Sequence, residues 1–77
     1  MTPEEVAVWA EARRDGLAAF VAEATQYRAR RNWPGSENNP TNQTYDHFLP
    51  EAADLLAALE EMRVAAVQAA QKGVNNP

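Results

Sequence analysis

The sequence predicts an all-α fold, a two-helix antiparallel hairpin with a long aromatic-containing loop. Two long segments carry apolar residues at the three- and four-residue spacing of an amphipathic helix. Each segment also has residues typical of a helix start and a helix end. Between them lies a polar stretch rich in Asn and Pro, residues 32–49. With 77 residues, the chain has room for one domain, 1–77.

The first helix is predicted over residues 3–31. Thr2 suits the N-cap, Pro3 suits the first helical position, and Glu5 completes a capping box with Thr2. At about 100° per residue, one face of this helix carries a row of apolar residues. The members of this predicted stripe are Val6, Trp9, Leu17, Phe20, Ala24 and Tyr27.

Two residues interrupt the predicted stripe. Gly16 lies at its edge, where glycine costs about 1 kcal/mol relative to alanine but permits close backbone approach. Arg13 falls at its centre, one turn from Trp9 and one from Leu17. Either the Arg13 stem lies along the apolar surface while its head reaches water or an acid at the rim, or Arg13 pairs with a carboxylate on a neighbouring helix or stacks on Trp9.

The second helix is predicted over residues 50–72. Pro50 suits its first position, Lys72 meets the helix dipole near its end, and Gly73 supplies the stop before a short tail, 73–77. Because this helix is shorter than the first, part of the first helix's stripe stays uncovered in a monomer. An uncovered apolar stripe predicts association.

The predicted loop, 32–49, is longer than the usual connection between packed helices. Its aromatic residues Trp33, Tyr45 and Phe48 have two interpretations. They either cap the open end of the helix pair or form a docking surface, where Trp and Tyr often act as anchors. Trp33-Pro34-Gly35 resembles the W-x-G turn of small secreted helical hairpins over three residues, but Tyr45 precedes the second helix instead of following it in a Tyr-x-x-x-acid signal, so we assign no family.

The sequence holds no motif for catalysis, a cofactor or a metal. There is no glycine-rich phosphate loop and no readable Ser-His-Asp set. The chain has no cysteine, and its one histidine, His47, lacks a second nitrogen or sulfur ligand for zinc. We therefore predict a protein that is not an enzyme and that has no catalytic residues, no cofactor and no metal site.

Composition favours a protein partner. Sixteen residues are alanine, so the core is small, and a chain of this size needs a partner, a cofactor or self-association to complete it. A net charge of −4 argues against nucleic acid, no apolar run approaches the roughly 20 residues of a membrane span, and no basic segment of a signal peptide precedes the first helix. We expect a cytoplasmic or virion protein that is not secreted and that forms a homo-oligomer or a subunit of a complex.

Three functional hypotheses follow. The first is a non-catalytic assembly protein that associates with itself or with a larger scaffold, such as a small accessory or minor structural component of a phage particle. The second is a small acidic regulator or inhibitor of one cellular protein, with an acidic face of Glu11, Asp15, Glu23, Glu60 and Glu61. The third is a helical DNA-binding dimer that uses Arg28, Arg30 and Arg31. The candidate partner-binding residues are Trp9, Arg13, Leu17, Phe20, Tyr27, Trp33, Tyr45 and Phe48.

Overall fold

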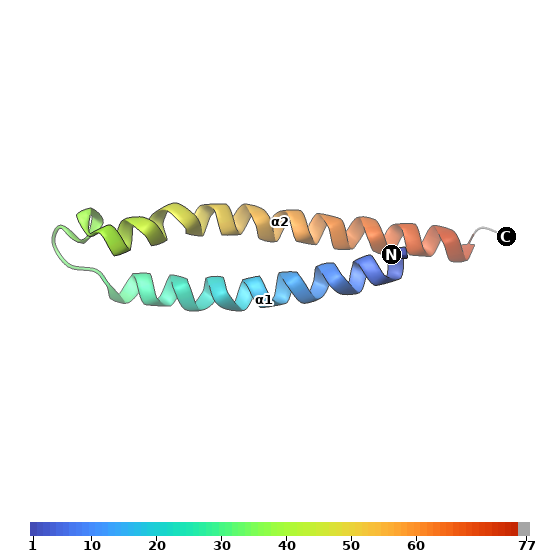
Figure 1. Ribbon diagram of the computed structural model, residues 1–77, viewed down its shortest axis with the longest axis horizontal. Helices are drawn as coiled ribbons and strands as arrows, with labels where there is room; N and C mark the ends of the chain where they lie inside the picture. The colour runs from blue at the N-terminus through green and yellow to red at the C-terminus, as the bar shows by residue number, and fades with distance from the viewer. Residues whose placement is uncertain (76–77) are drawn as a thin grey trace.

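The chain forms a hairpin of two long antiparallel α-helices, as a computed structural model of residues 1–75 describes it (Figure 1). Helix α1 covers Pro3–Arg30, a single 3-10 turn, η1, covers Ser36–Asn38, and helix α2 covers Pro40–Asn75. The predicted all-α hairpin is confirmed. Neither helix, over the residues described, is apolar over a long enough stretch to cross a membrane.

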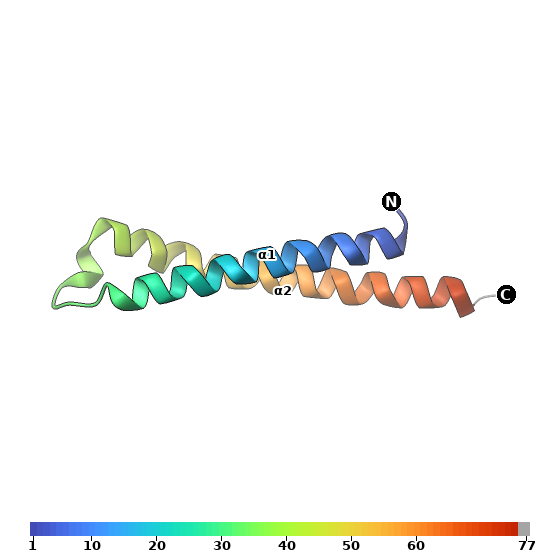
Figure 2. The same cartoon turned by 90° about the horizontal axis from the view of Figure 1, so that it is seen from below.

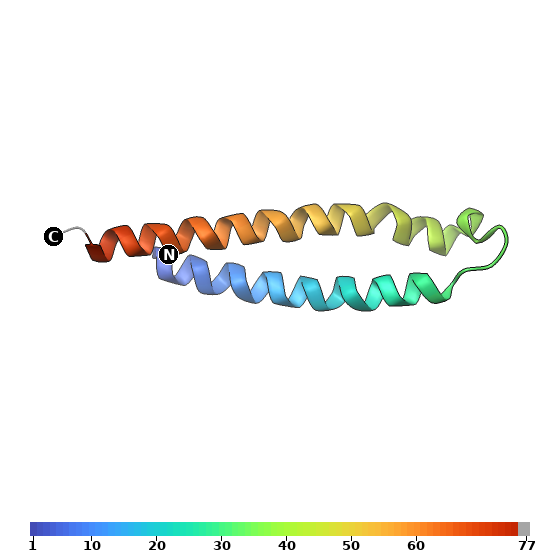
Figure 3. The same ribbon diagram turned by 180° about the vertical axis from the view of Figure 1, so that it is seen from behind.

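The hairpin is elongated. Its extents are 64 × 16 × 15 Å and its radius of gyration is 17.6 Å, against about 11.5 Å for a compact domain of this length. Seen at right angles to Figure 1, the two helices cross instead of running side by side throughout (Figure 2). From behind, the end of α2 extends past the start of α1 (Figure 3). The described residues therefore form a single pair of helices, and no further element covers the outer faces of this pair.

Helix α1 begins as predicted. Thr2 is extended at φ −77° and ψ 162°, and its hydroxyl oxygen accepts a hydrogen bond from the Glu5 N–H at 3.2 Å. The Thr2 hydroxyl also lies 3.2 Å from Glu5 Oε1. The helix ends at Arg30, one residue before the predicted end at Arg31.

Helix α2 begins at Pro40, so the prediction of a loop over 32–49 and a helix start at Pro50 is wrong. The Asn39 side chain accepts hydrogen bonds from the backbone N–H groups of Thr41 (3.0 Å) and Asn42 (3.2 Å). Asn39 is extended, at φ −72° and ψ 129°, as an N-cap residue is. Pro40 then takes the first helical position, where its missing N–H has no cost.

Pro50 lies inside α2. A proline there removes one backbone hydrogen bond and favours a bend in the helix. Figure 2 shows the green to yellow part of α2 running at an angle to the rest of the helix. Pro50 suits a first helical position as well as Pro40 does. However, Leu49 has no side chain that can cap a helix, whereas Asn39 before Pro40 has one.

The other end of α2 also differs from the prediction. The helix continues through Gly73 to Asn75, so Gly73 is not the stop. Only Gly35 has positive φ among the described residues, so Gly73 lacks the left-handed conformation that ends many helices. Residues 76–77 of the predicted tail lie outside the described residues.

The contact between the helices is built mainly from small side chains. The buried apolar residues are Ala10, Ala24, Leu59 and Ala66, and the largest fully buried side chain in the described region is that of Asn42. On α1 the line of least exposure runs along Ala10, Arg14, Leu17, Val21 and Ala24. The aromatic members of the predicted stripe, Trp9, Phe20 and Tyr27, lie at the edge of this contact and stay exposed. Alanine lets two helix backbones approach closely, and the large rings are pushed to the side of that contact.

Candidate functional site

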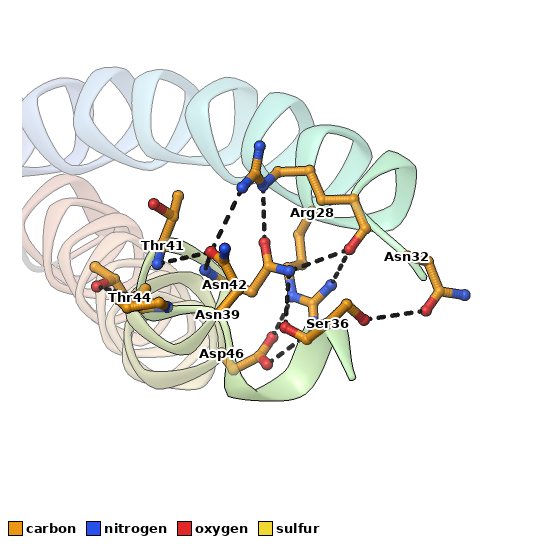
Figure 4. A network of polar contacts seen from close by, with 10 residues as sticks. Arg28, Asn32, Ser36, Asn39, Thr41, Asn42, Thr44 and Asp46 are labelled. Carbon is orange, nitrogen blue, oxygen red and sulfur yellow. Dashed lines mark hydrogen bonds and ion pairs between the residues drawn. The ribbon is translucent and has the colours of Figure 1, made fainter. Parts of the chain in front are cut away.

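A buried asparagine organises the connection end of the hairpin (Figure 4). Asn42 is 0% exposed. Its amide nitrogen donates to the backbone carbonyls of Ser36 (2.9 Å) and Arg31 (3.2 Å), and its oxygen accepts from Arg31 Nε at 2.8 Å. One side chain from α2 thus ties the end of α1 to η1. Nothing in its local sequence distinguishes Asn42 from the neighbouring exposed asparagines, so sequence reasoning missed it.

An ion pair joins the two helices beside Asn42. Arg28 of α1 donates to both carboxylate oxygens of Asp46, at 2.8 and 3.1 Å, and to the carbonyl of Arg31 at 2.9 Å. The hydrogen bond from Arg28 lowers the pKa of Asp46, and the same contact raises the pKa of Arg28. A two-pronged contact of this kind fixes the relative position of its partners. It therefore sets the register of α1 against α2 near the turn.

Arg31 lies between two aromatic rings. Its guanidinium carbon is 5.4 Å from the ring centre of Tyr27 and 5.4 Å from that of Trp33, within the range of a cation–π contact. Trp33 therefore makes a contact within the chain, through an arginine that also binds Asn42, although Trp33 stays 43% exposed. In the basic cluster of Arg28, Arg30 and Arg31, two of the three guanidinium groups are engaged in intrachain contacts.

A second ionic cluster lies on one side of the hairpin body. Glu60 of α2 accepts hydrogen bonds from Arg63, at 2.6 and 3.0 Å, and from Arg14 of α1. The bonds from Arg63 and Arg14 lower the pKa of Glu60 to about 2. Arg14 also pairs with Asp15 at 3.0 Å. The interhelix arginine pair considered for Arg13 is made by Arg14 instead, because position 14 lies nearer the line of contact with α2.

The opposite side of the hairpin carries most of the large apolar side chains. Phe20 and Phe48 stack with ring centres 5.9 Å apart, Phe48 and Tyr45 are 5.1 Å apart, and Tyr45 and Tyr27 are 5.1 Å apart. Residues at intervals of seven, about two helical turns, continue this row along both helices, with Arg13 and Val6 before Phe20 on α1 and Leu55 and Met62 after Phe48 on α2. We call this surface the aromatic flank. It comprises Val6, Trp9, Arg13, Gly16, Phe20, Tyr27, Tyr45, Phe48, Leu55 and Met62.

Shallow hollows follow one another along the aromatic flank. One, of about 480 Å³, is lined by Phe20, Glu23, Ala24, Gln26, Tyr27, Arg30 and Tyr45. The next, of about 430 Å³, is mainly apolar and is lined by Trp9, Ala12, Arg13, Gly16, Leu17, Leu55 and Leu59. A third, of about 360 Å³, includes Met1, Val6 and Met62. Their order follows the order of their lining residues along α1, so they form a row between the two helices, and we call this row of hollows the groove.

The predicted partner-binding residues divide between this groove and the turn. Trp9, Arg13 and Leu17 line the middle hollow, and Phe20, Tyr27, Tyr45 and Phe48 form the aromatic row. Arg13 stacks on Trp9, with its guanidinium carbon 5.6 Å from the ring centre, which is one of the two interpretations given for it. Trp33 lies apart, at the turn.

The candidate set omitted Leu55 and Met62, which are 53% and 43% exposed. Their seven-residue spacing from Phe48 is the sequence signal that identifies them.

The chemistry available on this surface is that of contact and stacking. No group of three or more His, Cys, Asp or Glu side chains converges on a metal position within the described part of the chain. The acids and bases that the described structure brings together form ion pairs between or along the helices.

Comparison of the chain with protein-family models, with curated proteins and with solved structures finds no match in any of the three.

Proposed function

We propose that this chain is a non-catalytic assembly protein that binds another protein through its aromatic flank. The observation that carries this proposal is the distribution of apolar side chains. Three of the four apolar residues that are buried in the described part of the chain are alanines, whereas Trp9, Phe20, Leu55 and Met62 are each more than 40% exposed. A contiguous exposed apolar surface of this kind is typical of an interaction site.

The total accessible surface supports the same proposal. It is 5570 Å², whereas a compact monomer of 8.5 kDa exposes about 4,700 Å². The difference is close to the roughly 800 Å² that each partner buries in an interface of standard size. Docking of one protein on the groove would bring the chain to the exposure of an ordinary folded domain.

The experiment that tests the proposal is site-specific photo-crosslinking from the flank. A photoreactive amino acid is placed at Leu55 on the flank or, as the matched control, at Val64. Val64 is 40% exposed and lines a hollow formed by α2 alone with Glu60, Glu61, Ala65 and Gln68. In living cells of its source, protein adducts are expected from position 55 and not from position 64. Adducts from position 64 alone, or from neither position, would contradict the proposal.

The alternative functions are less well supported by the contacts. Of the acids in the hypothetical regulatory face, Glu60 is held by two arginines and Asp15 pairs with Arg14, so they do not present a uniform negative surface. In the basic cluster, Arg28 and Arg31 make the contacts at the turn. We therefore propose neither a charge-mimicking regulator nor a DNA-binding dimer.

A further inference from the structure

We propose that the partner on the aromatic flank is a second copy of this chain, packed with its turn at the opposite end, so that two hairpins form an antiparallel four-helix bundle. This inference rests on the proposed function and names its partner. Positions of low exposure on α1 recur at seven residues, as in Ala10, Leu17 and Ala24, and beside them the flank adds the apolar residues Trp9, Phe20 and Tyr27. A face of that width is typical of helices that contact two neighbours in a bundle, whereas a two-stranded pair uses a narrower seam.

Charge along α1 favours the antiparallel arrangement. The first turn of α1 carries Glu4 and Glu5, and its last turn carries Arg28 and Arg30. When α1 faces a reversed copy of itself, the acidic turn of one chain lies near Arg30 of the other, and the two helix dipoles oppose each other favourably.

A two-fold axis that crosses the flank at the height of residue 18, on the side of α1 away from the Ala18 side chain, makes the flank complementary to itself. Residues that face each other across such an axis have numbers that add to the same sum. The register that sets Arg13 against Glu23 of the second copy also sets Trp9 against Tyr27 and Gly16 against Phe20. Opposite charges meet, and the aromatic rings pair with each other. Leu55 lines the same hollow as Gly16 and Leu17, so it lies close to this axis.

Gly16 is the most specific feature of the proposed interface. A Cβ atom added to Gly16 would meet nothing within 4 Å, so no contact inside the chain requires glycine there. Glycine in a helix interior is nevertheless unfavourable compared with alanine. The adjacent hollow of about 430 Å³ faces outward, and Phe20, 53% exposed, is of a size to enter it from the second copy. Insertion of Phe20 from the second copy requires that residue 16 has no side chain.

The first test is the mass of the full chain by sedimentation equilibrium from 1 to 100 µM. A mass of twice 8.5 kDa is expected. Substitution Leu55→Glu places two carboxylates beside the axis and is expected to raise the dimer dissociation constant at least about a hundredfold. The matched substitution Val64→Glu, on the outer side of α2, is expected to leave it unchanged. A monomer at 100 µM, a larger oligomer, or equal effects of the two substitutions would overturn the proposal.

The second test uses Gly16, where the expected effects on the helix and on the dimer have opposite signs. Gly16→Leu improves the helix propensity of α1 but fills the hollow, so the dissociation constant is expected to rise about tenfold or more. Ala18→Leu, at an exposed position on the other side of α1, is the control and is expected to leave association unchanged. A dimer that is as tight or tighter with Gly16→Leu contradicts the insertion of Phe20.

The third test fixes the orientation. The chain has no cysteine, so Glu37→Cys in the exposed turn gives one spin label per chain. Turns at opposite ends predict a label separation of about 50 Å from the helix rise of the intervening residues, whereas turns at the same end predict about 20 Å. The shorter distance would overturn the antiparallel bundle.

These outcomes are distinct from a failure of the proposed function. A chain that stays monomeric but still gives adducts with a different protein from position 55 contradicts the second copy while leaving the flank as the binding surface. Adducts confined to position 64 contradict both.

Discussion

The connection end and the body of the hairpin are held together by different means. At the connection end, directional contacts between specific atoms join the helices: the three hydrogen bonds of Asn42 and the two-pronged pair of Arg28 with Asp46. Along the body, the helices meet through alanines and a single well-buried leucine, Leu59. The large apolar side chains of the body lie beside that contact and face outward.

The two regions therefore have different roles, one in aligning the helices and one in presenting a surface, whereas a larger domain would align its elements through the same core. Polar contacts at the turn fix the direction and register of α2 relative to α1, and they need no further protein. The body instead provides a long surface whose burial is incomplete within one chain. Substitutions in the two regions measure whether stability resides at the turn, and whether the contacts of the body hold it as weakly as its small core indicates.

Asn42→Ala is expected to have the largest effect. It removes the three hydrogen bonds of a fully buried side chain and leaves Arg31 Nε without its partner, while the Arg31 and Ser36 carbonyls each keep one donor. The loss costs about 3 kcal/mol. Urea unfolding followed by circular dichroism at one protein concentration measures the loss. Asn38→Ala is the matched control, because Asn38 is exposed and lies in the same turn. Equal losses for the two variants would show that the turn is not held by Asn42.

Leu59→Ala tests the body and is expected to cost less, about 2 kcal/mol. That value is at the low end for a leucine truncation, because the residue lies beside an open hollow that solvent can enter. The same unfolding measurement applies, with Val64→Ala as the exposed control, for which a change within about 0.5 kcal/mol is expected. A loss larger than that of Asn42→Ala would reverse the comparison between the two regions.

The two helix caps provide a finer comparison between the regions. Asn39→Ala at the turn is expected to cost about 1 kcal/mol, whereas Thr2→Ala at the open end is expected to cost about half as much, because the first turn of α1 frays locally. Unfolding measurements give both values, and amide hydrogen exchange at Thr41 and Asn42 is expected to accelerate only in Asn39→Ala. If Thr2→Ala costs more, the open end is held more tightly than its contacts indicate.

The sequence predicts these regions to different degrees. The hairpin and the start of α1 follow from local patterns, because Thr2, Pro3 and Glu5 form a start signal that needs no tertiary contact. Asn39-Pro40 is the same kind of signal, yet Pro50 offers a competing start, and a polar segment rich in Asn and Thr has low helix propensity. Packing of Tyr45 and Phe48 on Tyr27 and Phe20 stabilises that segment as a helix. Such packing depends on α1, which is distant in the sequence, and it is invisible in a local pattern.

On α1 the candidate site is predicted in composition and in face, but not in its place relative to α2. Its aromatic members share one face, as predicted, but ranking residues by hydrophobicity does not reveal that Trp9 and Phe20 lie beside the contact between the helices. Packing geometry places Ala10 and Ala24 there, since small residues allow close approach. The burial of Asn42 has no sequence signal at all, because it is created by the carbonyl groups of Ser36 and Arg31 that the fold brings around it.

The smallest expected effect concerns the charged side of the body and appears as a dependence on pH. Glu60 has its pKa lowered from 4.5 to about 2 by Arg63 and Arg14, so its contribution to stability is present above about pH 4.5 and is lost as the pH falls toward 2. The melting temperature of the wild-type chain is expected to fall across this window. Glu60→Gln is expected to be less stable at pH 7 and to show a shallower fall. Glu61→Gln, at an exposed position on the outer side, is the control and is expected to retain the wild-type slope.

Arg28 likewise lowers the pKa of Asp46. Asp46→Asn therefore tests the connection end in the way that Glu60→Gln tests the body. If the register is set at the turn, Asp46→Asn is expected to lower the melting temperature at pH 7 more than Glu60→Gln does, because Asp46 is held by two donor atoms of one arginine next to the buried Asn42. The opposite order would mean that the ionic cluster of the body, and not the turn, aligns the two helices. In that case the ion pair of Arg14 with Glu60 would set the relative position of the two helices, and with it the shape of the groove on the aromatic flank.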